Sequence, residues 1–172
     1  MRPLLALLIL VSTQVSGDSC FPGNSSLDSP TDRYSIDWKE PSDGETHHLF
    51  FRTNAVPPTR QPLLDFGRSA CIYWEPGETH FALTWNMGSN VSETYIYPTN
   101  DISKRIEIWD LIPTYISDQM RGYFHVYVRA KEWSKAGLAI SITGHGREEH
   151  NEQILDVTIM CIKNNTGWRC DG

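Results

Sequence analysis

Short runs in which apolar side chains occupy every second position recur through most of the chain. Leu138, Ile140 and Ile142 alternate with small residues, and Phe81 and Leu83 alternate with more polar ones. Successive side chains of a strand point to opposite faces of a sheet, so each run predicts a strand with one apolar face. Such strands are typical of antiparallel sheets that expose their other face to water. Helical spacing is confined to residues 110–120, where a proline permits only a short element.

Turn-forming segments such as PSDG, EPG, NMG, PTN and GHG separate the runs. The pattern predicts about nine strands in one domain. Their expected positions are residues 34–39, 48–52, 70–74, 80–85, 94–97, 105–109, 123–129, 138–143 and 155–163. The expected fold class is all-β, an antiparallel β-sandwich of jelly-roll or immunoglobulin-like type, with a closed barrel as the alternative.

The chain begins MRPLLALLILVSTQVSG, in which one arginine precedes an apolar run that ends in small and polar residues. This pattern predicts a secretory signal peptide over residues 1–17, because the run is shorter than the roughly 20 residues that a membrane-spanning helix needs. An extended arm is expected at 18–33, which is rich in Ser, Pro, Asp and Gly, followed by a single β-sandwich domain at 34–172. We expect a secreted, extracellular protein that does not insert into membranes and is compatible with a monomer.

The four cysteines are Cys20, Cys71, Cys161 and Cys170. An even count in an oxidising compartment predicts two disulfides, and C-x8-C is too wide for a zinc knuckle or a redox pair. If the chain folds back over residues 164–167, Cys161 lies opposite Cys170 and Lys163 lies opposite Trp168, at a separation suited to a disulfide. This geometry favours Cys20–Cys71 with Cys161–Cys170. The pairing of Cys71 with Cys161 and of Cys20 with Cys170 is the open alternative.

Three Asn-x-Ser/Thr sequons begin at Asn24, Asn90 and Asn164. In a secreted chain each predicts a surface glycan, and glycans are bulky enough to mark faces that are unsuited to an interface. The stretch CIKNNTGWRC is therefore expected to be a disulfide-stapled hairpin with a glycosylated tip. The net charge of −6 argues against nucleic acid and anionic membranes as partners.

Catalytic and metal-binding residue types do not converge in the sequence. The segment HGREEHNE offers His145, Glu148, Glu149 and His150, yet it lies between two predicted strands and is interpreted as a solvated loop. The segment EPGETH, residues 75–80, is interpreted as a hairpin turn rather than a carboxylate–histidine pair. There is no G-x-S-x-G elbow and no phosphate-binding loop. We expect no enzyme activity, no metal and no cofactor.

Aromatic and basic residues on the predicted polar faces are the stronger signal, because Tyr, Trp and Arg are enriched at interface hot spots. The predicted binding residues are Trp109, Tyr123, His125, Tyr127, Arg129, Lys131, Trp133 and Lys135. Large aromatic side chains are usually mostly buried, so a core role is the competing interpretation for each of them. The segment VRAKEWSKAG, residues 128–137, is either a contact for an acidic partner or sulfated glycan, or a solvated loop whose tryptophan packs on the sheet.

Together these patterns predict a secreted glycoprotein that binds an extracellular or cell-surface protein without catalysis, as a ligand, receptor-like or immune-modulatory module. A lectin-like module that stacks sugars on Trp and Tyr is the first alternative. A small secreted metal-dependent hydrolase built on the HGREEH segment is the second.

Overall fold

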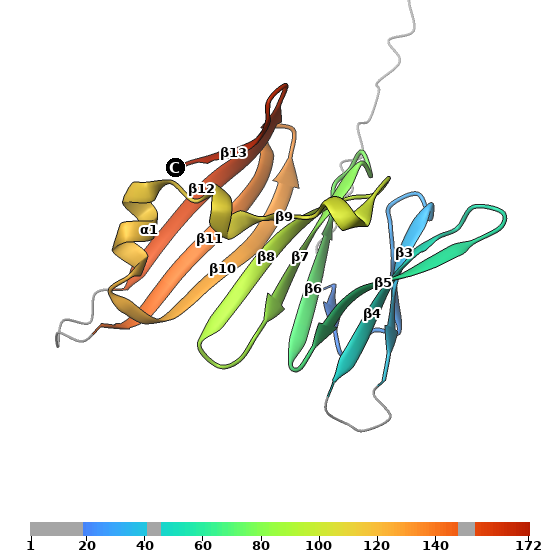
Figure 1. Ribbon diagram of the computed structural model, residues 1–172, viewed down its shortest axis with the longest axis horizontal. Helices are drawn as coiled ribbons and strands as arrows, with labels where there is room; N and C mark the ends of the chain where they lie inside the picture. Colours follow the sequence, from blue (N-terminus) through green and yellow to red (C-terminus); the bar gives the residue numbers. More distant parts are fainter. Residues whose placement is uncertain (1–18, 41–45, 148–153) are drawn as a thin grey trace, which may run out of the picture.

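The computed structural model describes residues 19–40, 46–147 and 154–172, and this part of the chain is mainly β-structure (Figure 1). Sheet A has nine strands and sheet B has four. Almost all neighbouring strands are antiparallel, and sheet B packs on one face of sheet A. The predicted antiparallel β-sandwich is therefore confirmed.

Sheet A has the order β1-β6-β7-β8-β10-β11-β12-β13, and β9 pairs with β8. The bounds of its strands are β1 Cys20–Phe21, β6 Ser69–Trp74, β7 His80–Asn86, β8 Val91–Pro98, β9 Ile106–Glu107, β10 Tyr123–Ser134, β11 Gly137–Arg147, β12 Leu155–Asn164 and β13 Gly167–Asp171. Sheet B has the order β2-β3-β4-β5, with β2 Ser26–Asp28, β3 Tyr34–Lys39, β4 His47–Thr53 and β5 Thr59–Phe66. The connection from β8 to β10 carries η1 Ile102–Lys104, β9, η2 Ile108–Leu111 and α1 Thr114–Met120.

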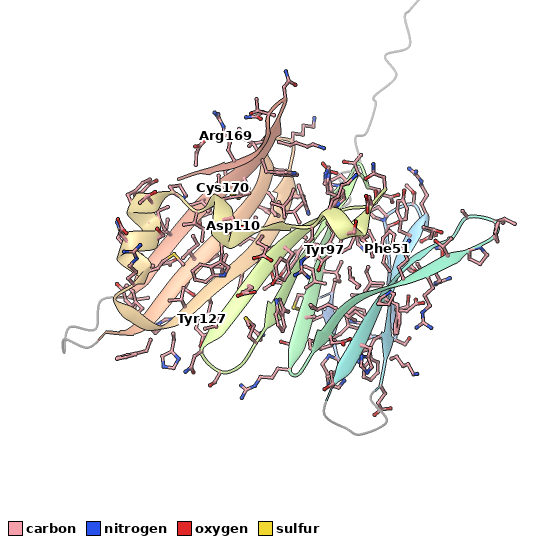
Figure 2. All side chains as sticks on the ribbon, viewed as in Figure 1. Phe51, Tyr97, Asp110, Tyr127, Arg169 and Cys170 are labelled. Atoms are coloured by element: carbon pink, nitrogen blue, oxygen red, sulfur yellow. A yellow bond between two sulfur atoms is a disulfide. The ribbon has the colours of Figure 1, made fainter. Side chains whose placement is uncertain are left out.

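Two layers cover opposite faces of sheet A over different strands. Sheet B covers one face of β6–β8, where the Phe81 ring stacks on Phe51 and Tyr97 at centroid distances of 5.7 and 5.0 Å. Figure 2 shows Phe51 and Tyr97 in the region where the two sheets meet. On the opposite face, η2 and α1 cover β10–β13, and Ile108 and Ile116 join Ile140 in a second core. The two cores are thus offset along the sheet, as the order of strands in Figure 1 shows.

Strand β7 is buried on both faces, which corrects the expectation that one of its faces is wet. Ala82 belongs to the second core, and Thr84 is also buried. The cause is β10, whose backbone lies against this face: Thr94 Oγ1 donates to the carbonyl oxygen of Val128 at 2.8 Å, and the N–H of Ala130 donates to Thr84 Oγ1 at 2.9 Å. These hydroxyls therefore satisfy backbone groups that would otherwise be buried without partners.

Two further segments differ from the sequence-based expectation. Only β9 forms within 105–109, because the chain then turns helically and buries Ile108, Ile112, Ile116 and Met120 at a spacing of four residues. Strand β5 was not among the predicted strands. It contains Pro62, which is tolerated because β5 is an edge strand of sheet B.

Both favoured disulfides are present, Cys20–Cys71 and Cys161–Cys170. Across the β12–β13 hairpin, Cys161 pairs with Cys170 and Lys163 with Trp168, as expected. The first disulfide joins β1 to β6, so the segment expected to be an arm enters sheet A, and β2 enters sheet B. No helix within the described ranges is long and apolar enough to cross a membrane. The predicted signal peptide lies outside the described residues.

Candidate functional site

His80 is the centre of a polar site formed by two hairpins that are distant in sequence. It begins β7, directly after the β6–β7 turn, and is only 5% exposed. The β12–β13 hairpin contributes Lys163, whose Nζ lies 3.4 Å from His80 Nε2, and Trp168, whose ring meets the imidazole edge-on at 5.3 Å. The Cys161–Cys170 disulfide joins the two strands two residues away from this pair. The stapled hairpin therefore positions two of the side chains that cover His80.

Glu75 fixes the other side of the imidazole. Its Oε2 accepts from Thr79 Oγ1 at 2.5 Å and from the His80 backbone N–H at 3.0 Å, and it lies 3.3 Å from His80 Nδ1. An ammonium group can only donate, so Nε2 must accept from Lys163 and the neutral ring carries its proton on Nδ1. The EPGETH segment is thus the expected turn and also forms the carboxylate–histidine pair that was considered less favourable.

The protonation state of His80 follows from its surroundings. Burial lowers the pKa of His80 below its usual value, and the Lys163 ammonium lowers it further. The hydrogen bond to Glu75 and its charge oppose both effects, but the net direction is downward. His80 is therefore neutral at physiological pH and serves as a hydrogen-bond acceptor for Lys163.

A tryptophan pair continues this site toward β10. The rings of Trp133 and Trp168 are 5.9 Å apart and nearly perpendicular, and Trp133 Nε1 donates to the carbonyl oxygen of Tyr73 at 2.8 Å. Trp133 reaches this face because the register of β10 shifts between Ala130 and Glu132, which inserts one residue and exchanges the faces beyond it. The predicted binding residue Trp133 is accordingly half-buried against the core.

A pocket of about 300 Å³ opens beside His80, and we call it the His80 pocket. Its lining includes Arg33, Glu78, His80, Asn100 and Lys163. Glu78 is 3% exposed and has a φ of 55°, which is uncommon for a residue other than glycine. Its carboxylate accepts from the Thr31 N–H at 2.5 Å and from Thr31 Oγ1 at 2.7 Å. A residue held in this conformation requires firm surroundings, so the rim of the pocket is preformed.

The groups around the His80 ring form a chain of hydrogen bonds. A nucleophilic triad needs a hydroxyl or thiol facing the imidazole nitrogen that receives the proton. Here Nε2 faces the Lys163 ammonium, and the Thr79 hydroxyl lies 2.8 Å from Nδ1, the nitrogen that carries the ring proton. The described ranges contain no group of three or more His, Cys, Asp or Glu side chains that could hold a metal ion. Glu148, Glu149 and His150 of the HGREEH segment lie outside the described residues, whereas His145 is exposed at the end of β11.

Two other predicted binding residues also contact the second core. Trp109, on η2, and Tyr123, at the start of β10, are half-buried against the second core. Phe124, which alternation places on the same face as the buried Val126 and Val128, is 59% exposed. The strand end at Tyr123 therefore does not follow simple alternation.

The remaining aromatic and basic residues border an uncovered sheet surface, which we call the outer face. It is the face of β10–β12 opposite α1 and η2, and cross-strand pairing arranges it in three rows: Tyr127–Thr143–Asp156, Arg129–Ser141–Thr158 and Glu132–Ala139–Met160. The Arg129 guanidinium lies 4.5 Å from the centroid of the Tyr127 ring. His145 lies beside Tyr127, with ring centroids 6.2 Å apart, and His125 is its cross-strand partner. Lys131 and Lys135 are exposed beyond this surface, at the bulge and the β10–β11 turn.

The burial of the tryptophans weakens the lectin interpretation, and the positions of the sequons limit the surface that is free for a partner. All six tryptophans are partly buried. The three sequons lie in different surroundings. Asn90 is exposed in a bend, and Asn164 is exposed at the end of β12. Asn24 is half-buried, and its Nδ2 donates to the carbonyl oxygen of Cys20 at 2.9 Å. The carbonyl oxygen of Asn90 accepts from the Val126 N–H at 2.9 Å, so this sequon lies next to the Tyr127 end of the outer face.

Comparisons with protein families, with curated proteins and with solved structures gave no match. The function must therefore be argued from the sites themselves.

Sequence reasoning missed Arg33, Glu78 and Lys163 as site residues. The pairing of Lys163 with Trp168 was correctly predicted, but its approach to Glu75 and His80 depends on how the hairpins pack. The available signal was the EPGETH segment, in which a carboxylate–histidine pair was considered but a hairpin turn was preferred.

Proposed function

We propose that this protein is a secreted, non-catalytic module that binds an extracellular or cell-surface protein through the outer face of β10–β12. The observation that carries the proposal is the uncovered state of this face: Arg129, Glu132, Asp156 and Thr158 are exposed, whereas the opposite face of the same strands is a closed core. Two disulfides and the apolar N-terminal segment support the extracellular assignment.

The outer face has side chains suited to a protein hot spot. Tyr127 Oη donates to the carbonyl oxygen of Ser89 at 2.7 Å, and Arg129 stacks over the same ring. The Tyr127–Arg129 pair is therefore held in place before a partner arrives, which reduces the conformational entropy lost on binding. Tyrosine and arginine are also among the residues most enriched at such positions.

The size of the face sets the extent of the interface. Three strands about 4.8 Å apart and about eight residues long, at roughly 3.4 Å each, cover only about 400 Å². A stable interface buries about 800 Å² on each partner, so the contact must extend past the three rows. A glycan on Asn90 would obstruct the Tyr127 end, and a glycan on Asn164, at the end of β12, would obstruct the β12 margin of the other end. Extension is therefore favoured along β10, past Arg129 toward Lys131 and Lys135. Neither lysine has an ion-pair partner among the described residues, so this margin suits acidic groups of the partner.

The test compares charge reversal on the outer face with the same change elsewhere. The glycosylated protein is immobilised, partners are captured from extracellular fluid and solubilised cell-surface proteins, and the affinity of each purified partner is measured. Arg129→Glu should weaken binding at least about tenfold, as expected for a hot-spot arginine. Arg121→Glu is the matched control, because Arg121 is exposed after α1, on the opposite side of the sheet. Equal affinities of Arg129→Glu and wild type would refute the proposed surface, and binding that disappears when the partner is deglycosylated would favour a lectin.

A further inference from the structure

We propose that the His80 pocket binds a small oxyanion, a carboxylate or sulfate group on a ligand no larger than one sugar residue. The site lies where β7 begins and β8 ends, between Arg33 of the sheet B layer and the β12–β13 hairpin, and it shares no residue with the outer face. Its volume of about 300 Å³ is at the lower end for ligand pockets, which excludes larger ligands from full enclosure.

The carboxylates near the pocket already have internal partners. Both oxygens of Glu78 accept hydrogen bonds from Thr31, and the side chain is buried. Glu75 Oε2 accepts from Thr79 and from the His80 backbone. These acidic groups therefore stabilise the turn and offer little to a bound cation.

The cations of the pocket are in the opposite situation. Neither Arg33 nor Lys163 forms an ion pair with any carboxylate in the described parts of the chain. Lys163 donates one hydrogen bond, to His80, and keeps two N–H groups for a ligand. The guanidinium of Arg33 donates to Tyr34 Oη at 3.4 Å and lies over the same ring, which leaves most of its donors unused. The free hydrogen-bonding capacity of the pocket is thus mainly that of charged donors, which match an oxyanion.

The pocket is also preorganised for a ligand of fixed position. Thr99 Oγ1 donates to the carbonyl oxygen of Glu78 at 2.8 Å and lies 3.2 Å from that of Thr79, which ties the end of β8 to the β6–β7 turn. Lys163 is fixed from the other side by the stapled β12–β13 hairpin. Donors held on such a rigid frame lose little entropy when an anion binds.

The test uses nuclear magnetic resonance of the isotopically labelled full-length secreted protein. Sulfate, acetate and N-acetylneuraminate are titrated at constant ionic strength, with neutral N-acetylglucosamine as the uncharged comparison. We expect saturable shifts of the His80 imidazole and the Trp168 indole with the anionic probes, because both rings adjoin Lys163. Saturation by sulfate and acetate identifies a site for the bare oxyanion, whereas saturation by N-acetylneuraminate alone identifies an acidic sugar as its source.

Charge-neutral variants locate the site. Lys163→Gln and Arg33→Gln should each weaken binding about tenfold, the lower end for a charge-assisted hydrogen bond, because both side chains are partly hydrated. Lys135→Gln, an exposed lysine on the β10–β11 turn, should bind like wild type. Circular dichroism and thermal unfolding confirm that each variant is folded. Non-saturating shifts, equal binding of the neutral sugar, or unchanged affinity in both Lys163→Gln and Arg33→Gln would overturn the proposal.

Discussion

Removal of the Cys161–Cys170 disulfide should weaken the fold and change the environment of His80. The disulfide closes a loop with a sequence separation of only 9 residues. Loop-closure entropy for a loop of that length contributes about 2.6 kcal/mol to the free energy of unfolding. Both cysteines are buried in the second core, so the double variant C161A/C170A also loses packing and should lose at least this amount.

The control is the other disulfide, removed by the same chemistry. Cys20–Cys71 spans 51 residues, for which loop closure gives about 4.1 kcal/mol. Urea unfolding followed by tryptophan fluorescence measures both losses. A loss well below about 2 kcal/mol in C161A/C170A would refute the view that the short staple holds the hairpin.

The two variants should differ most at His80. Without its staple, the β12–β13 hairpin no longer holds Lys163 and Trp168 against the imidazole, so burial and positive charge are both reduced. Because both effects lower the pKa of His80, its pKa should rise in C161A/C170A and stay unchanged in C20A/C71A. Titration of the imidazole by nuclear magnetic resonance measures this directly. An unchanged pKa in C161A/C170A would show that the hairpin keeps its position without the disulfide.

Three further predictions test the fold. The folded-state pKa of His80 is below 6.5, so the unfolded chain binds the extra proton first and stability should fall as the pH decreases below about 6.5; His80→Gln should flatten this part of the urea-unfolding profile. Thr94→Val leaves the buried carbonyl of Val128 without its side-chain donor and should cost about 1–3 kcal/mol of unfolding free energy, whereas no measurable loss would contradict that role. Gly137→Ala should lower the free energy of unfolding by about 1–3 kcal/mol or more, because φ is +140° and a Cβ would collide with the Cys161 carbonyl oxygen. Gly67→Ala is the control: its surroundings are open, so its melting temperature should stay close to that of wild type.

Local pattern predicted the parts of the fold that depend on neighbouring residues. Alternation located β3 and β11, and hairpin geometry placed Cys161 opposite Cys170. These inferences succeeded because side-chain direction in a strand and register in a short hairpin are set locally. The strand was expected to end at residue 129, so alternation made no statement about Trp133. One inserted residue after Ala130 turns its side chain toward the core, which agrees with the interpretation of a tryptophan that packs on the sheet.

The candidate sites depended on tertiary packing and were harder to predict. The Glu75–His80 pair was visible in the sequence, but the burial of His80 results from Trp168 and Lys163, which lie more than eighty residues away. The wet face expected for β7 is closed because β10 lies against it, and periodicity in β7 contains no information about that strand. Sequence pattern therefore located the side chains but not their partners.

The offset of the two covering layers explains why this sheet has two candidate sites. Sheet B covers one face of β6–β8, and η2 with α1 covers the opposite face of β10–β13. Neither layer covers the second face of β6–β8 or the second face of β10–β13. Over β6 and β7, the side chains of Trp133, Trp168 and Lys163 fill this second face, and the His80 pocket lies at its margin. Over β10–β12 no described element fills the second face, and the outer face remains open to solvent. A continuous sheet with layers displaced in opposite directions therefore generates both a small polar pocket, at the ends of β7 and β8, and a flat contact surface over β10–β12.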